Sequence, residues 1–233
     1  MASKIGLNLY TRKSFTPGVV TSNLVLKHNY TAGSVVPVSD GAAFFDGTND
    51  YIALTSAITL SSDSTPCSIT FWAWRNVIDQ WHAVLGNSGV GNYQFALFDN
   101  SGGNRLIFEG ETDGDNLEGV TAIVAKEWNH FAITTDGSAG GKMYQNGVEI
   151  SVTVNNTFDW DITLDRIGAG TGNWMGGYLC NIGIWSGTQL SQAQVKSIMN
   201  KNYAGLTTGT GGETENLVSW WNLSADANDS HGS

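Results

Sequence analysis

Short runs of aromatic and β-branched residues, separated by turns rich in glycine, asparagine and aspartate, make up most of this 233-residue sequence. Residues 68–74 (SITFWAW) are typical, because Ile69 and Phe71 stand at alternate positions and would share one face of a strand. Asn146 and Gly147 form a strong hairpin signal, since both residues tolerate the positive φ of a two-residue turn. Strands at this spacing predict an all-β fold, with antiparallel strands in a sandwich or barrel and not alternating β/α units.

Helical periodicity is clear only in residues 190–203. Ser191 and Gln194 have the spacing of a capping box, in which each side chain accepts a hydrogen bond from a free backbone N–H of the first turn. Val195 and Ile198 then fall on one face of the helix. This pattern predicts one short amphipathic helix near the C-terminal end, packed on the sheets.

Charge and composition exclude several classes of protein. The chain has 11 Lys and Arg against 21 Asp and Glu, and its net charge of −10 disfavours binding to nucleic acid. Nine Trp and a hydrophobic content of 41% can form a core, which excludes a disordered acidic chain. No apolar run approaches the ~20 residues that span a bilayer, so we expect no membrane insertion. Gly6 and Asn8 interrupt the apolar N-terminal residues, so we expect no signal peptide and synthesis in a cytoplasm.

Two segments of the chain share a pattern. Residues 23–30 (NLVLKHNY) and 216–223 (NLVSWWNL) have Asn, Leu, Val and a second Asn at the same offsets. Either this is a chance similarity between two edge strands, or residues 216–233 are the start of a second, incomplete module. Residues 205–215 precede this segment and have the composition of a flexible Gly/Thr linker.

Five motifs follow one another along the chain: residues 45–52 (FDGTNDYI), 68–74, 128–131 (WNHF), the pair Asn146 and Gly147, and residues 177–185 (GYLCNIGIW). In this order they resemble the laminin-G-like group of the concanavalin A-like lectin and glucanase superfamily. The resemblance implies that residues 41–204 form a jelly-roll sandwich of two curved antiparallel sheets, with the helix beside the last strand. It also implies a concave face, which in this group often meets glycans or proteins.

The layout of the chain resembles laminin-G-like proteins of tailed-phage virions. This resemblance implies a non-enzymatic virion component, such as a capsid decoration, fibre or tail-associated protein, that can also bind host surface glycans. Residues 1–40 would form an arm that docks the protein to other virion proteins. The alternative is a stand-alone carbohydrate-binding lectin module. A homo-oligomer is compatible with both, because exposed sheet edges need to be covered.

The loop that follows Phe45 is a candidate metal site. Asp46, Asn49 and Asp50 place two carboxylates and an amide on one glycine-containing loop, and calcium prefers such oxygen ligands. Members of the laminin-G-like group often hold a calcium ion near loops of this kind. The alternative is that Asp46 and Asn49 cap the turn through hydrogen bonds to the backbone. Only one ion is expected, because the loop of residues 168–174 contains no carboxylate.

Three acidic residues raise the question of catalysis. Glu109, Glu111 and Asp113 stand at every second position and would share one face of a strand. Glucanases of the superfamily use acids at such spacing, one as nucleophile and one as general acid. Those enzymes place the aspartate in the middle, whereas here the order is Glu, Glu, Asp. We therefore interpret the segment as a solvated turn and predict no enzyme; a glycosidase using Glu109 and Glu111 is the least favoured hypothesis.

The tryptophans are the remaining candidates for ligand binding. Trp81, Trp160 and Trp174 lie near predicted loops, where an exposed indole can stack on a sugar or contact a protein. Packing at the bases of the loops is the alternative for these three. Four others lie in predicted strands and are expected to pack in the core. These are Trp72, Trp74, Trp128 and Trp185.

Overall fold

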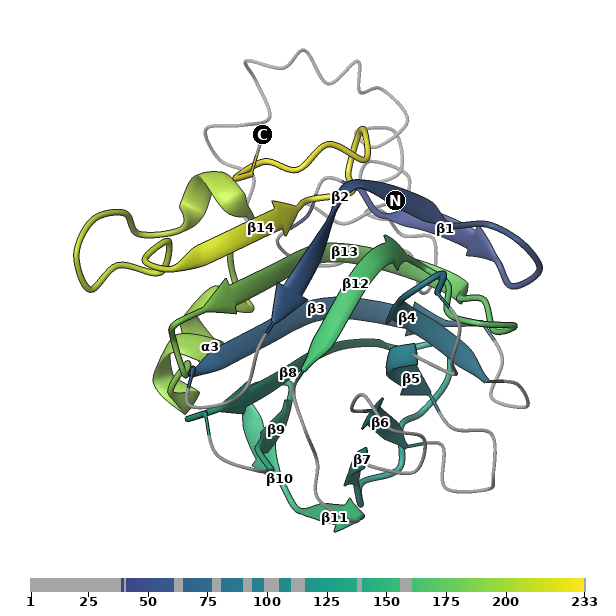
Figure 1. Ribbon diagram of the computed structural model, residues 1–233, viewed down its shortest axis with the longest axis horizontal. Helices are drawn as coiled ribbons and strands as arrows, with labels where there is room; N and C mark the ends of the chain where they lie inside the picture. The colour runs from purple at the N-terminus through teal and green to yellow at the C-terminus, as the bar shows by residue number, and fades with distance from the viewer. Residues whose placement is uncertain are drawn as a thin grey trace, which may run out of the picture. The chain divides into compact units, whose positions relative to one another are not determined.

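The computed structural model describes residue 39 and residues 41–60, 65–76, 81–89, 94–98, 105–109, 116–137, 140–155 and 161–232. These residues form two antiparallel seven-stranded sheets that pack face to face, with one α-helix near the C-terminal end (Figure 1). The predicted all-β antiparallel fold is confirmed. None of the helices in the described residues is long and apolar enough to cross a membrane.

The strand order determines which strands lie at the edges. Sheet A contains, in spatial order, β1 (Ala43–Asp46), β13 (Gly176–Ser186), β3 (Cys67–Arg75), β8 (Trp128–Thr135), β9 (Lys142–Gln145) and β10 (Val148–Ile150). Its seventh strand, β14 (Leu217–Trp221), also pairs with β13. Sheet B contains β11 (Val152–Asn155), β7 (Asn116–Gly119), β6 (Leu106–Glu109), β5 (Gln94–Phe98), β4 (His82–Gly86), β12 (Ile162–Ile167) and β2 (Ile52–Leu60). One side of β13 is therefore shared by β1 and β14, and β2 and β11 are the two edge strands of sheet B.

The core lies between the two sheets. Ile69 and Phe71 on β3 are fully buried, as the alternation of residues 68–74 predicted. The ring of Phe71 lies 5.6 Å from that of Phe131 on β8, and Leu164 of sheet B packs into the same cluster. Each of these side chains contributes about 1.5–3 kcal/mol through removal of apolar surface from water.

The predicted hairpin joins β9 to β10. Asn146 and Gly147 have φ of 51° and 75°, the positive values that a two-residue turn of this kind requires. The Asn146 side chain also anchors the turn, because its Oδ1 accepts a hydrogen bond of 2.9 Å from the His130 N–H. The hairpin prediction is confirmed.

The predicted helix is α3 (Gln192–Ile198), and its capping box between Ser191 and Gln194 is present. Val195 and Ile198 are buried against Tyr144, Trp185 and Trp220 in a second apolar cluster, separate from the core between the sheets. The helix therefore covers only part of the outer face of sheet A.

A buried glutamate organises the segment between α3 and β14. Within residues 205–215, Glu213 accepts hydrogen bonds of 2.8 and 2.6 Å from Lys201 Nζ and one of 2.8 Å from the Thr207 N–H. Burial alone would raise the pKa of Glu213, but hydrogen bonds to Lys201, Ser197 and Thr207 outweigh it and hold the pKa below its ordinary value. The segment leads into β14, a strand of sheet A.

Candidate functional site

The candidate calcium loop connects β1 to β2. Asp46 Oδ1 accepts hydrogen bonds from the N–H groups of Thr48 (2.7 Å) and Asn49 (3.3 Å), and Asp50 Oδ2 accepts one from the Asp46 N–H (3.0 Å). Asp46 therefore caps the turn, as the alternative to metal binding expected of Asp46 and Asn49, and Asp50 also caps the loop. The described residues contain no group of three His, Cys, Asp or Glu side chains that could hold a metal ion. Calcium binding at this loop stays a prediction.

The predicted ligand-binding tryptophans lie in different surroundings. Trp81 is partly buried against Ala83 and Ile107, in a small cluster separate from the core. Trp174 is also partly buried and pairs with Ala169 in an isolated bridge within the loop before β13. Trp160 lies outside the described residues, as do Glu111 and Asp113 of the acidic segment. The cluster around Trp81 agrees with packing at the base of a loop, and ligand binding by Trp81, Trp160 and Trp174 stays a prediction.

A row of four aromatic side chains crosses one end of sheet A. Phe44 on β1 lies opposite Tyr178 on β13, and their ring centroids are 5.1 Å apart. Tyr178 lies opposite Trp74 on β3, with centroids 5.4 Å apart. Trp74 in turn lies opposite Trp128 on β8, whose ring is 6.3 Å from that of Tyr178. We call these four residues the aromatic row.

The aromatic row faces away from the core. Phe45 and Ala73, which adjoin row residues in the chain, are buried between the sheets, and successive residues of a strand point to opposite faces. The Phe44 side chain is 55% exposed, and the other three are partly buried. Trp72 is the neighbouring residue of β3 on the same face, and the end of α3 covers it. Its Nε1 donates a 3.1 Å hydrogen bond to the Met199 carbonyl.

Trp74 and Trp128 are expected to pack in the core, and the structure bears this out only in part. Both lie on the outer face and are only partly buried, but Trp128 also packs against the core cluster. Trp72 and Trp185 are buried as predicted, at 7% and 0% exposure. The sequence alternation already assigns Trp72 and Trp74 to one face of a strand. It carries no signal for how far the helix extends over that face, which decides which of the two is open.

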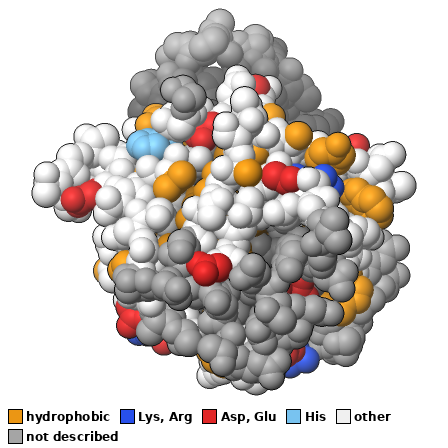
Figure 2. Space-filling model, viewed as in Figure 1, with side chains coloured by type: hydrophobic (Ala, Val, Ile, Leu, Met, Phe, Trp, Pro, Cys, Tyr) orange, Lys and Arg blue, Asp and Glu red, His pale blue; other side chains and the backbone are white. Residues whose placement is uncertain are grey.

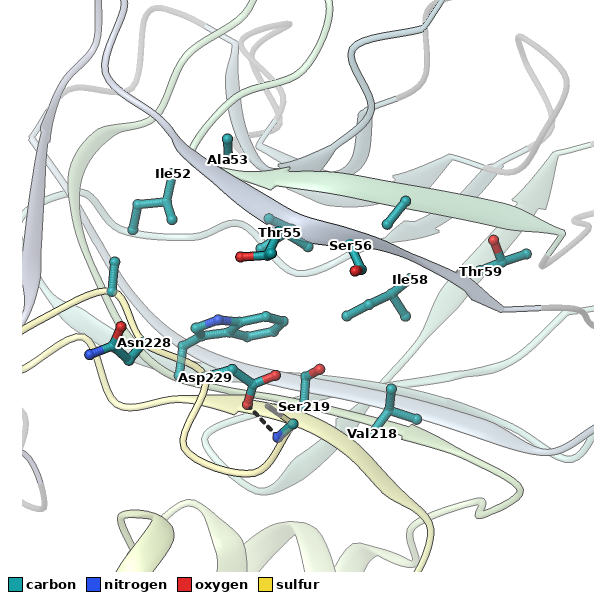
Figure 3. Close-up of a pocket in the computed structure, with 15 residues that line it drawn as sticks. Ile52, Ala53, Thr55, Ser56, Ile58, Thr59, Val218, Ser219, Asn228 and Asp229 are labelled. Carbon is teal, nitrogen blue, oxygen red and sulfur yellow. Dashed lines mark hydrogen bonds between the residues drawn. The ribbon is translucent and has the colours of Figure 1, made fainter.

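A groove separates the edge strands β2 and β14, which belong to different sheets. It has a volume of about 680 Å³. Figure 3 shows Ser56 and Ile58 of β2 opposite Ser219 of β14 and Asp229 of the C-terminal segment. No sequence motif pointed to this groove, because its two walls lie some 160 residues apart in the chain.

The charge of the surface affects which ligands can approach it. In the view of Figure 2, acidic side chains are spread over the visible face and basic side chains are few. This agrees with the net charge of −10 of the whole chain. A surface of this sign repels anionic ligands at long range and leaves neutral ligands unaffected.

The comparisons with known proteins agree with this fold. Residues 46–196 match the family Laminin_G_3, described as the concanavalin A-like lectin/glucanases superfamily. No curated protein matches the chain. A candidate carbohydrate-binding protein from Bacteroides ovatus has a TM-score of 0.55 and 16% identity, over 80% of this chain and 55% of that chain. The present chain thus spans about half the length of that protein.

Two further solved structures are more distant. Domain 4 of the extracellular arabinanase AbnA from Geobacillus stearothermophilus, in complex with arabinotriose, has a TM-score of 0.46 and 19% identity, over 68% of this chain and 81% of that chain. A pentraxin from Limulus polyphemus has a TM-score of 0.44 and 14% identity, over 67% and 80%. The family match, by contrast, covers most of the chain. The sequence of this chain and its two antiparallel sheets together show that it belongs to the Laminin_G_3 family of the concanavalin A-like lectin/glucanases superfamily.

Proposed function

We propose that this chain is a non-enzymatic carbohydrate-binding module, and that its aromatic row binds the apolar face of a neutral glycan. The observation that carries the proposal is the row itself, in which four neighbouring strands place one aromatic ring each on the same outer face. Aromatic rings offer a large apolar surface, which suits the C–H face of a sugar ring, and Tyr178 adds a hydroxyl group. Four adjacent strands span about 14 Å, so the row can contact more than one sugar.

Binding is favoured over catalysis by the chemistry of the row. Glycoside hydrolysis uses a pair of carboxylates on either side of the scissile bond. The row instead offers three apolar or indole rings and the phenol of Tyr178. A module of this kind holds a glycan and leaves it intact.

The test is a carbohydrate microarray followed by calorimetry on the glycans that bind. Phe44→Ala and Tyr178→Ala remove row side chains at exposed or partly exposed positions, and each should weaken binding by about tenfold, or about 1.4 kcal/mol. Tyr51→Ala is the matched control, because Tyr51 is also an exposed aromatic residue (50%) but stacks under Arg166 and lies outside the row. Equal losses in all three variants, or no glycan bound by the intact chain, would contradict the proposal.

The virion role is a separate matter. It was expected from the layout of the chain and from residues 1–40, of which the structure describes only residue 39. A carbohydrate-binding module is compatible with that role and does not require it. The docking of residues 1–40 to other virion proteins, and homo-oligomer formation, stay predictions.

A further inference from the structure

The groove between β2 and β14 is made of different strands from the aromatic row. Its described lining consists of Ile52, Ala53, Leu54, Thr55, Ser56, Ala57, Ile58, Thr59, Val218, Ser219, Trp221, Ala227, Asn228, Asp229 and Gly232. Its volume of about 680 Å³ falls within the ~300–1,000 Å³ typical of small-ligand sites. The lining also has the mixture typical of such sites, in which apolar walls carry a few polar groups.

Asp229 is held rigidly in this lining. Its Oδ1 accepts three backbone hydrogen bonds, from the N–H groups of Trp220 (2.9 Å), His231 (2.9 Å) and Gly232 (3.0 Å). Figure 3 shows the carboxylate between the C-terminal segment and Ser219, with the hydrogen bond to Gly232 drawn. Because one oxygen fixes the side chain, the other is a preoriented acceptor beside the groove.

The polar groups around Asp229 are hydroxyls and an amide. Ser56 faces Ser219 across the groove, Thr55 lies next to Ser56, and Asn228 precedes Asp229. Among the described lining residues there is no Lys, Arg or His. An anionic ligand would therefore meet a carboxylate with no compensating cation, which excludes anions from the site.

A neutral ligand fits this chemistry better than a cation. Asp229 is the one acidic residue of the described lining, and three N–H groups already donate to its Oδ1, so the site offers a cation no second carboxylate and mostly hydrogen-bonding and apolar groups. Hydroxyl groups of a ligand would donate to the other oxygen and exchange hydrogen bonds with the serines and threonine. The apolar part of the ligand would lie against Ile52, Ile58 and neighbouring apolar side chains.

We propose that the β2–β14 groove is a second binding site, which takes an uncharged polyhydroxy ligand such as a single neutral sugar residue. It recognises this ligand chiefly through hydrogen bonds, whereas the aromatic row uses stacking. The two sites are chemically independent, so either can fail without the other.

The experiment uses the full chain with methyl glycosides of neutral hexoses, and n-butylamine as a cationic probe, followed by NMR of the backbone amides. Saturable shifts at Ser219, Asn228 and Gly232 report the groove, and shifts at Phe44 and Trp74 report the row. We expect at least one methyl glycoside to shift the groove amides, with affinity unchanged by added salt. Groove amides that respond only to n-butylamine, or to none of these compounds, overturn the proposal.

Two variants test the groove directly. Asp229→Asn keeps an oxygen for the three N–H donors but replaces the free acceptor with an NH₂ donor, and should weaken sugar binding by about tenfold. Ser56→Tyr fills the groove from an exposed strand position and should abolish binding even if Asp229→Asn perturbs folding. Glu149→Gln on β10, which also removes one surface carboxylate, is the matched control. Binding that survives both groove variants overturns the proposal.

Discussion

At the scale of single residues, His130 on β8 carries the clearest pH dependence. Its side chain is 1% exposed and lies edge-on to Trp72, with ring centroids 5.4 Å apart. Burial lowers the pKa of His130 to about 3, so the ring is neutral in the fold at every pH near neutrality. In the unfolded chain the same ring has an ordinary pKa of about 6.5.

We predict that His130 makes the fold lose stability as the pH falls. Because the folded pKa is the lower of the two, only the unfolded chain gains a proton between about pH 6.5 and the folded value, and the native state is favoured less and less. Between pH 7.5 and pH 4.5 this amounts to about 2–3 kcal/mol of unfolding free energy. Urea unfolding at both pH values measures the loss, and His130→Gln should remove most of it.

His231→Gln is the control for that measurement, because His231 is exposed and hydrogen-bonded to Tyr203 near the C-terminus. It should leave the pH dependence close to that of the unchanged chain. If His130→Gln and the unchanged chain lose the same stability between the two pH values, His130 is not neutral in the fold.

Asp46 shows how far a short motif can be interpreted at this scale. Two carboxylates and an amide on one loop fit either calcium binding or turn capping, and the sequence offers no way to choose. The structure shows Asp46 Oδ1 directed at the N–H groups of Thr48 and Asn49. The choice depends on the direction in which the side chain points, and composition does not encode that direction.

At the scale of elements, β13 and β3 form the centre of the aromatic row, and Gly177 allows them to approach. Gly177 has φ of +143°, and a Cβ at this position would lie 2.0 Å from the carbonyl oxygen of Trp74. Backbone atoms on the neighbouring strand cannot move aside as the end of a side chain could. The residue next to Tyr178 must therefore be glycine for the two strands to pair as they do.

We predict that Gly177→Ala disrupts the pairing of β13 with β3. The clash adds to the strain of a positive φ, so thermal unfolding should show a loss of more than about 3 kcal/mol, and glycan binding at the row should fall with it. Gly172→Ala is the matched control. Gly172 also has a positive φ, of +78°, but a Cβ there meets nothing within 4 Å, so only the strain of about 1–2 kcal/mol is expected. Similar losses in both variants would show that the strand contact at Gly177 does not matter.

Elements with local signals could be predicted from the sequence, and the aromatic row could not. The capping box of Ser191 and the turn at Asn146 depend on neighbouring residues, so they are visible in a short window. The row depends on the register of four strands, and the β13–β3 register itself shifts between Cys180 and Gly183. Pairing between distant segments sets that register, and a single sequence does not show it.

Residues 23–30 share only some of the residues that hold residues 216–223 in place. Asn216 and Asn222 have side-chain hydrogen bonds that hold β14 in place, to Gly187 and to Tyr203 respectively. The positions between them in β14, Trp220 and Trp221, are buried. Residues 23–30 have lysine and histidine at those two positions, so the similarity covers the asparagines and the buried Leu217 but not the two buried tryptophans.

In the molecule as a whole, the groove and the surface charge have different origins. The groove exists because the two sheets end in β2 and β14 on the same side of the sandwich, which depends on topology alone. Charge, by contrast, can be counted from the sequence, and it applies wherever the ligand binds. The net charge of −10 affects ligand binding and can be obtained from the sequence alone.

That charge predicts a preference between glycans with the same sugars. A sialylated oligosaccharide carries a carboxylate that its unsialylated counterpart lacks, and it approaches a chain of the same sign. We expect the sialylated form to bind about tenfold more weakly at low ionic strength. The difference should shrink in 1 M salt, because the screening length falls from about 30 Å at 0.01 M to about 3 Å. Calorimetry of both oligosaccharides at the two salt concentrations measures this. Neither the aromatic row nor the described lining of the groove contains a cationic side chain. A preference for the sialylated form that persists at high salt would therefore mean that a cationic site elsewhere binds the glycan.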